Sequence, residues 1–464
     1  MATTQEKLIS NITKELDNDA KVKVAAVDID GVLRGKVMQK SKFLSILKDG
    51  FGFCSVIFGW DIHDKVYMTG VEFSDEDSGF SDLVAKVDLN SFRRIPWENN
   101  LAFFLVELFH PKTLDPLYCC PRSTLRQVTK KLEEDGLTAY CGVEFEFFNF
   151  KETPESLVEK NYVGLTPLTQ GMFGYSLLRP TQNQQFYDEA YDLLRDFKVD
   201  IEGWHTETGP GVFEAALAYN NAMESADRAV LFKTSIKQLA INHGFIASFM
   251  AKPWNDLPGC SGHIHFSLKD TDGNNVFVPE DKSSKDGMSQ TMKHFVAGIL
   301  LGLPSILAVL APTVNSYKRL VENYWAPVTV SWGIDNRLGA IRVIIPPSCS
   351  KSATRIEMRV SGADINAHLA IAAVLACGHW GIRNKKEIPI APIGGDAAAD
   401  NATGTRLART LQEAYEQMSQ PDSVARQVLG DSFVDHYAKV KQHEWRLWQT
   451  AVTDFETKRY LELI

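Results

Sequence analysis

One stretch of the sequence, residues 315–360, places five arginines in an otherwise apolar and β-branched context. A guanidinium group that loses water needs an anionic partner to offset that loss. The run RIEMRV alternates charged and apolar residues, which predicts a β-strand with Arg355, Glu357 and Arg359 on one face. That face would lie either at a solvated edge or against a phosphate or carboxylate. The stretch therefore favours a protein with a sheet whose charged face binds an anion.

Length, charge and cysteine content limit the class of protein. The 464 residues suffice for two or three domains, and the net charge of -9 with dispersed basic residues argues against nucleic acid or an anionic membrane as partner. Seven cysteines without a CxxC pair fit a reducing compartment, and adjacent Cys119 and Cys120 are expected to be packed thiols. The first residues lack the apolar core of a signal peptide. A cytoplasmic protein is the expectation.

A long apolar run, residues 295–314, is nearly long enough to span a bilayer. Pro304 divides it, and polar segments flank it on both sides. We expect two buried helices that meet at Pro304.

Near the N-terminus, residues 22–38 have apolar runs on either side of Asp30 and Gly31, which predicts a β-hairpin. The same residues mimic the DxDG motif of haloacid dehalogenase phosphatases, in which Asp28 would be the nucleophile and a helix should follow the loop. Further short strand-like runs favour a compact α+β domain. The turn-rich segment 110–123 predicts a boundary between domains 1–115 and 116–464, followed by a helix with Ser123 as N-cap and Gly136 as its stop.

Carboxylates and imidazoles recur on other predicted strands. In YCGVEFEFF alternation puts Glu144 and Glu146 on one face, where they face solvent or share a cation. The Gly-Pro-Gly turn of HTETGPGVFE could bring Glu207 and Glu214 together, and GHIHFSL aims two histidines alike. Such an oxygen-dominated set suits two Mg²⁺ or Mn²⁺ ions, which beside arginines serve phosphoryl transfer. The residues alone thus predict a two-metal enzyme that handles nucleotide phosphate.

In their order along the chain, the motifs LRGK, FGWD, VEFEFF, HTETGPGVFE, GHIHFSL, NSYKRL, IDNRLGAIR and RIEMR resemble the glutamine synthetase family, in its type I-like branch. The resemblance covers nearly the whole chain. It implies an α+β fold, with a small N-terminal β-grasp-like domain and a large catalytic domain built on a curved antiparallel sheet with outer helices. It also implies a ring-shaped homo-oligomer with active sites between subunits.

The resemblance carries roles to individual residues. It implies one metal held by Glu146, Glu207 and Glu214, and a second held by Glu144, His263 and Glu357. The implied contacts to ATP come from Arg337, Arg342, Arg355, His265 and Ser267. The implied contacts to the carboxylates of glutamate come from Arg319 and Arg359. Tyr175 would line the site, and Asp61 would collect ammonium across a subunit interface.

The implied chemistry has two steps, and the sequence departs from the family at the second. ATP phosphorylates the γ-carboxylate of glutamate, and a nitrogen nucleophile then displaces phosphate. In VENYWAP the family's flap glutamate is matched by Trp325, and the glycine-loop asparagine is matched by Pro258. A tryptophan cannot act as a base, but its face attracts a cation by ~0.5 to 2 kcal/mol. Either Trp325 contacts a bulkier amine or it simply packs, and nearby Glu322 is a candidate substitute acid.

These observations rank the possible functions. First is an ATP-dependent ligase that forms a γ-glutamyl amide from a primary amine or polyamine. An ordinary glutamine synthetase that uses ammonia is second, and a catalytically reduced homologue with a structural role is third. The phosphatase comes last.

Overall fold

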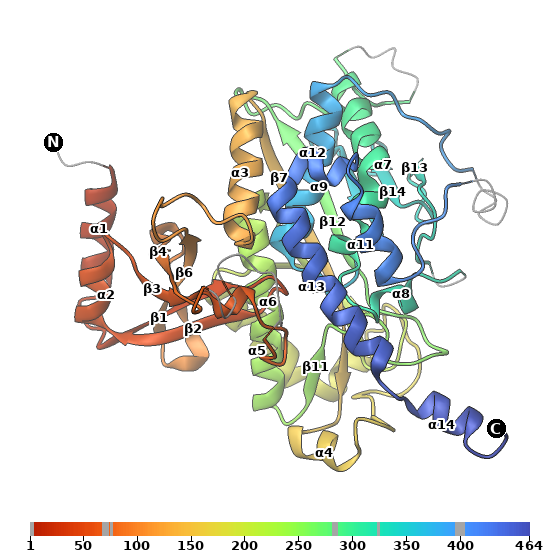
Figure 1. Cartoon of the computed structure of the whole chain (residues 1–464), viewed down its shortest axis with the longest axis horizontal. Helices are drawn as coiled ribbons and strands as arrows, with labels where there is room; N and C mark the ends of the chain where they lie inside the picture. The colour runs from red at the N-terminus through yellow and green to blue at the C-terminus, as the bar shows by residue number, and fades with distance from the viewer. Residues whose placement is uncertain (1–3, 67–73, 75–77, 281–285, 323–324, 395–403) are drawn as a thin grey trace.

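The structure is a computed structural model that describes residues 4–66, 74, 78–280, 286–322, 325–394 and 404–464. It contains two sheets. One is built from the N-terminal quarter of the chain, and the other is covered by the long helices (Figure 1).

The first sheet has six strands in the order β2-β1-β6-β4-β3, with β5 paired to β6. The strands are β1 (Lys21–Val27), β2 (Leu33–Gln39), β3 (Phe51–Cys54), β4 (Asp82–Val87), β5 (Arg93–Ile95) and β6 (Leu101–Phe109). The helices beside it are α1 (Thr4–Glu15) and α2 (Lys40–Ile46). Nearly every residue of β6 is buried, which explains its continuous apolar sequence LAFFLVELF.

The predicted hairpin at residues 22–38 is confirmed, because β1 and β2 pair antiparallel with Val22 opposite Met38. A strand follows the DxDG sequence where a phosphatase needs a helix. The Asp28 carboxylate is buried and forms an ion pair of 2.8 Å with Arg34. The phosphatase hypothesis is therefore wrong.

The second sheet has nine strands in the order β13-β14-β15-β12-β7-β9-β8, with β10 and β11 paired to β7. The strands are β7 (Thr138–Phe150), β8 (Ile201–Thr206), β9 (Val212–Leu217), β10 (Asn220–Asn221), β11 (Ile246–Ser248), β12 (Gly262–Lys269), β13 (Trp332–Ile334), β14 (Ile341–Ile344) and β15 (Arg355–Met358). All pairs are antiparallel except β13 with β14. The 13-residue strand β7 is the longest, and it organises the sheet by pairing with four others.

Helices cover this sheet on its outside (Figure 1). The helices in this part of the chain are α3 (Pro121–Glu134), α4 (Pro154–Glu159), α5 (Gln184–Asp196), α6 (Ala222–Asn242), α7 (Gln290–Leu310), α8 (Ser316–Arg319), α9 (Ala367–Arg383), α11 (Leu411–Ser419), α12 (Val424–Leu429), α13 (Asp431–Thr450) and α14 (Asp454–Tyr460). The last of them, α14, does not cover the sheet and extends away from it at the C-terminus. Short 3-10 helices occupy Ser55–Phe58, Leu89–Ser91, Pro96–Glu98, Arg179–Asn183 and Lys351–Ala353. The α+β class, with curled sheets and outer helices, is confirmed. The division at residues 110–123 stays a prediction.

The apolar run around Pro304 forms one helix, α7, so the expectation of two helices was wrong. Proline removes one backbone donor, but the helix continues because α9 and α11 pack along it and bury most of its residues. By length and composition α7 could cross a membrane, yet 78% of its most apolar window is buried inside the protein. This burial marks it as a core helix.

Helix α3 begins three residues earlier than predicted. Pro121 occupies its first turn, the N-cap is Cys120, and Ser123 is buried inside the helix. Proline is favoured at this position because its missing donor is not needed there. The predicted stop is confirmed, since Gly136 follows the helix with a φ of +75°. Cys119 and Cys120 are buried and form no disulfide with each other, as expected.

Candidate active site

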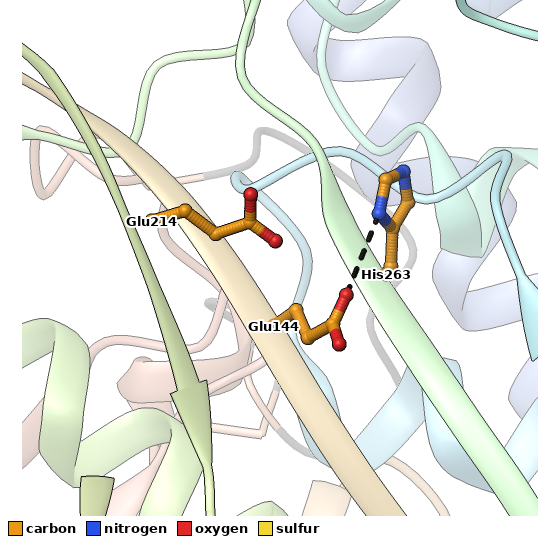
Figure 2. A group of neighbouring side chains, drawn as sticks. All are labelled: Glu144, Glu214 and His263. Carbon is orange, nitrogen blue, oxygen red and sulfur yellow. Dashed lines mark ion pairs between the residues drawn. The ribbon is translucent and has the colours of Figure 1, made fainter. Parts of the chain in front are cut away.

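The carboxylates predicted on separate strands meet on one face of the second sheet. The register places Glu146 opposite Glu214 between β7 and β9, and Glu144 opposite His263 between β7 and β12. Residues opposite each other in a sheet point to the same side, which brings their side chains within contact distance. Figure 2 shows Glu144, Glu214 and His263 converging from three strands, with 3.9 Å between the Glu144 carboxylate and Nδ1 of His263.

The cluster carries more negative charge than its own side chains balance. Burial, together with the charges of Glu146, Glu144, Glu207 and Glu357, raises the pKa of Glu214 to about 9. Burial also raises the pKa of Glu146, against the hydrogen bonds from Ser261. Carboxylates this close cannot all ionise unless a cation lies among them. The site is therefore built for positive charge.

Among the described residues, three groups have possible metal-ligating atoms within 4.8 Å of one another. They are Glu144 with Glu214 and His263, Glu144 with His265 and Glu357, and His205 with Glu207 and Glu214. Carboxylate oxygens and imidazole nitrogens fit a divalent cation. Five of the six residues implied as metal ligands belong to these groups. The groups combine these residues differently from the two implied metal sites. The Gly-Pro-Gly turn does bring Glu207 and Glu214 together.

The sixth, Glu146, is held by the loop before β12. Its two carboxylate oxygens accept hydrogen bonds of 2.7 Å from the backbone N–H and the hydroxyl of Ser261. That loop is tied in turn to the start of α8, where Asn315 exchanges hydrogen bonds with the backbone of Lys252. The altered glycine loop therefore positions a carboxylate.

Strand β15 lies between β12 and β14, so the alternative of a solvated edge strand is wrong. Glu357 forms ion pairs with Arg342, at 3.0 Å, and with Arg359. Burial would raise the pKa of Glu357, but nearby His263 and Arg359 lower it to about 2. Burial and the charge of Arg359 hold the pKa of His263 well below its ordinary value, so its ring stays neutral and able to ligate a metal.

The five arginines fall into different environments. Arg319 is 5% exposed and donates to the backbone carbonyl of Val360. Arg337 is exposed, and its own carbonyl accepts a hydrogen bond of 2.9 Å from Arg359. Arg355 donates to His265 at 3.1 Å. The site thus has buried guanidinium groups on one side and an exposed one at its rim.

A cavity of 460 Å³ adjoins the carboxylates. Its lining includes His265, Ser267 and Arg355, the three residues placed on the nucleotide side, together with Tyr140 and Tyr219. Its aromatic and hydroxyl groups, with Arg355 at the wall, can accommodate a planar base and a phosphate.

Asp61 does not belong to the carboxylate cluster and lies in a loop beside α13. Its carboxylate accepts hydrogen bonds from the backbone of His63 and Lys65 and lies 3.1 Å from Nε2 of His443. Burial would raise the pKa of Asp61, but the Lys65 and His443 contacts lower it. An anionic Asp61 is thereby held in a loop, and its implied role across a subunit interface stays a prediction.

Trp325 is 71% exposed and has a φ of +57°, a conformation that bulky residues rarely adopt. Its indole projects from the segment instead of packing in the core. Glu322, the candidate substitute acid, forms an ion pair of 2.6 Å with Arg406, which lowers its pKa. A carboxylate held in this way is a weaker base.

Sequence reasoning missed His205, which belongs to one of the three groups, and Ser261. A signal for His205 was present, because alternation along the strand places residues 205 and 207 on one face. Tyr175 does line this part of the site, since its ring stacks on His205 with 4.4 Å between ring centroids. For Ser261 there was no signal, because its contact depends on a loop conformation.

Comparisons with known proteins agree with this geometry. Residues 118–460 match the family described as the glutamine synthetase catalytic domain. The type-1 glutamine synthetase 2 of Dictyostelium discoideum is 48% identical over 99% of this chain and 87% of its own length. The glutamate–isopropylamine ligase of a Pseudomonas species is 35% identical over 97% of this chain and 96% of its own. The solved structure of a GmaS/ADP complex superposes with a TM-score of 0.83 at 25% identity, covering 98% of this chain and 99% of that one.

Proposed function

The chain belongs to the glutamine synthetase family and is an ATP-dependent ligase, and from this premise we propose that it joins the γ-carboxyl group of glutamate to a primary amine. The observation that carries this choice is Trp325, which projects an exposed indole where the family has an acid. An indole attracts an organic cation but cannot take a proton from ammonium. The likeness to a glutamate–isopropylamine ligase along nearly the whole chain supports the same choice.

In the first step the γ-carboxylate of glutamate attacks the terminal phosphorus of ATP, and ADP leaves. We assign Arg337, Arg342 and Arg355 to the phosphates, and Arg319 and Arg359 to the carboxylates of glutamate. The nucleotide occupies the 460 Å³ cavity beside His265 and Ser267. Two Mg²⁺ or Mn²⁺ ions, when bound by the five glutamates and His263, supply charge neutralisation for the phosphoryl group.

In the second step the amine nitrogen attacks the carbonyl carbon of the acyl phosphate. Phosphate leaves, an amide bond forms, and the nitrogen loses a proton to a base or to water. Trp325 selects the amine by covering its alkyl group and its cationic form. Arg406 holds the Glu322 carboxylate in an ion pair, so this carboxylate does not replace the missing base.

We also propose a ring-shaped homo-oligomer in the cytoplasm. Asp61 would then act at the boundary between subunits, where His443 and the backbone of its own loop fix it as an anion. A fixed carboxylate at the boundary between subunits would attract a cationic amine towards the active site.

The second candidate is synthesis of glutamine from ammonia. It is favoured by the 48% identity to a type-1 glutamine synthetase. The two candidates share the first step and differ only in the nucleophile.

A panel of nucleophiles separates them. Purified protein with ATP, Mg²⁺ and glutamate is given ammonia, methylamine, ethylamine, isopropylamine, ethanolamine or putrescine, and released phosphate is measured. We expect kcat/KM for at least one amine to exceed that for ammonia by about tenfold or more, equivalent to about 1.4 kcal/mol. Equal or better use of ammonia would favour the glutamine synthetase. Binding of ATP without turnover on any nucleophile would favour the catalytically reduced homologue.

Glu357→Ala tests the shared first step. This variant should lose turnover with every nucleophile, because it removes a metal ligand and the partner of two arginines. Glu189→Ala, which removes an exposed carboxylate paired with His243, is the matched control and should keep activity. Retained turnover in Glu357→Ala would contradict the metal assignment.

A further inference from the structure

His205 is the one imidazole of the site for which the family resemblance implied no role. It lies on β8 opposite Glu214, and its Nε2 is 3.6 Å from the Glu214 carboxylate. Ligating atoms of His205, Glu207 and Glu214 lie within 4.8 Å of one another. The ring is therefore near enough to share a cation with both carboxylates.

The hydrogen bonding of His205 decides which nitrogen is available. Its Nδ1 lies 3.0 Å from the backbone carbonyl oxygen of Thr206. A carbonyl oxygen only accepts, so Nδ1 carries the hydrogen and the lone pair of the neutral ring is on Nε2, which faces the carboxylates. Histidines that ligate metals commonly donate their second nitrogen to a carbonyl in this way.

The orientation of the ring is held by its surroundings. Tyr175 stacks on it at an interplanar angle of 25°. The backbone N–H of Tyr175 donates to the Thr206 carbonyl at 2.8 Å, and the Thr206 hydroxyl donates to the Phe173 carbonyl at 2.7 Å. The loop that carries Tyr175 is thus anchored to the strand that carries His205.

His265 makes an informative contrast, because its proton is on the other nitrogen. The guanidinium of Arg355 donates to Nδ1 of His265 at 3.1 Å, so Nδ1 must accept and Nε2 carries the hydrogen. That Nε2 lies 3.0 Å from the Glu144 carboxylate. In this tautomer His265 presents an N–H and no lone pair to the Glu144 carboxylate, so the group of Glu144, His265 and Glu357 could bind a cation through His265 only in the other tautomer.

We propose that His205 ligates a divalent cation through Nε2, together with Glu207 and Glu214. This assignment deepens the proposed function, on which it rests for the presence of a cation in the site. A nitrogen ligand beside carboxylates favours a transition-metal ion such as Mn²⁺ over Mg²⁺, which prefers oxygen. The structure thus assigns the site an additional ligand, His205, and a preference for Mn²⁺ over Mg²⁺.

Pulsed electron paramagnetic resonance on the Mn²⁺-loaded protein tests this directly, because coupling to ¹⁴N reports imidazole bound to Mn²⁺. Mn²⁺ is added substoichiometrically, without ATP or amine, to wild type and to three variants. We expect His205→Asn to remove one class of ¹⁴N coupling. It should also weaken Mn²⁺ binding by at least about 10- to 100-fold, because that is the loss seen when a residue that only supports a metal ligand is removed. His263→Asn should remove the other class, and His265→Asn should leave both.

Wild-type ¹⁴N coupling and unchanged Mn²⁺ affinity in His205→Asn would overturn the proposal. Thermal unfolding of each metal-free variant checks that the fold is kept, and Tyr175→Phe, which preserves the stack, should retain the coupling. The measurement involves no turnover. Intact ¹⁴N coupling in a protein that uses no nucleophile would therefore contradict the proposed function and leave the ligand assignment standing.

Discussion

Two buried clusters of charge in this molecule differ in how their charges are balanced. At the junction between the first sheet and helices α3 and α6, Arg122 is 1% exposed and contacts Asp88 at 2.8 Å, Glu107 at 3.3 Å and Asp227 at 2.8 Å. On the active-site face, the largest charge effects on Glu214 come from four other glutamates, Glu144, Glu146, Glu207 and Glu357. Both are buried acid clusters, but each carboxylate of the first contacts Arg122, whereas Glu214 in the second pairs with His205 and, among the described residues, with no arginine.

The difference appears in the direction of the pKa shifts. Burial would raise the pKa of Asp227, but Arg122 and the hydrogen bond with His368 lower it far below its ordinary value. Burial raises the pKa of Glu214 to about 9, because its carboxylate neighbours add to the effect. Removing one member of a balanced buried cluster leaves an uncompensated charge and destabilises the fold, whereas an unbalanced cluster of carboxylates is completed by binding a cation. We infer that the first cluster holds the first sheet against helices α3 and α6, and that the second serves catalysis.

The largest effect should come from breaking the balanced cluster. Asp227→Asn removes the carboxylate that accepts two hydrogen bonds from the buried Arg122, and it should lower the free energy of unfolding by about 3–5 kcal/mol. Chemical denaturation at pH 7 measures this change.

Asp192→Asn is the matched control, because Asp192 and Arg195 form an exposed ion pair with 62% and 56% of their side chains accessible. It should change stability by less than about 0.5 kcal/mol. If Asp227→Asn were as mild as this control, the junction cluster would not stabilise the fold.

The same type of substitution in the unbalanced cluster should have the opposite sign. A carboxyl group whose folded pKa is raised from 4.5 to about 9 contributes stability that is fully present below pH 4.5 and is lost as pH rises towards 9. Glu214→Gln escapes that loss, so the metal-free variant should be more stable than wild type at pH 8, by on the order of 1–3 kcal/mol.

Denaturation of both proteins at pH 5 and pH 8 should show the gap opening with pH, while ligase activity of the variant is lost. A Glu214→Gln protein that is less stable than wild type at pH 8 would contradict the raised pKa of Glu214.

A smaller effect is expected at Trp325, outside both clusters. Trp325→Glu removes the aromatic face and restores an acid, so kcat/KM for the preferred amine should fall by an amount equivalent to ~0.5 to 2 kcal/mol while use of ammonia rises. Trp325→Phe keeps an aromatic face and is the control. Unchanged preference in Trp325→Glu would mean that the indole does not contact the amine.

Local patterns in the sequence predicted the strands of the site, because alternation in YCGVEFEFF and RIEMRV specifies which side chains share a face. The continuity of helix α7 through Pro304 was harder to predict, since packing by α9 and α11 overrides the effect of the proline. The junction cluster escaped prediction entirely. Arg122 and Asp227 are separated by 105 residues, and neither lies in a pattern that points to the other.

The release of protons when a cation binds would show whether the carboxylates around Glu214 are the cation site. Glu214, with a pKa of about 9, is protonated at pH 7 and must give up its proton when a divalent cation binds. Calorimetric titration of the protein with Mg²⁺ at pH 7, in two buffers of different ionisation enthalpy, should show release of about one proton per chain, and the release should be lost in Glu214→Gln. Cation binding without proton release, or equal release from wild type and Glu214→Gln, would contradict the claim that this unbalanced cluster is the cation site of the ligase.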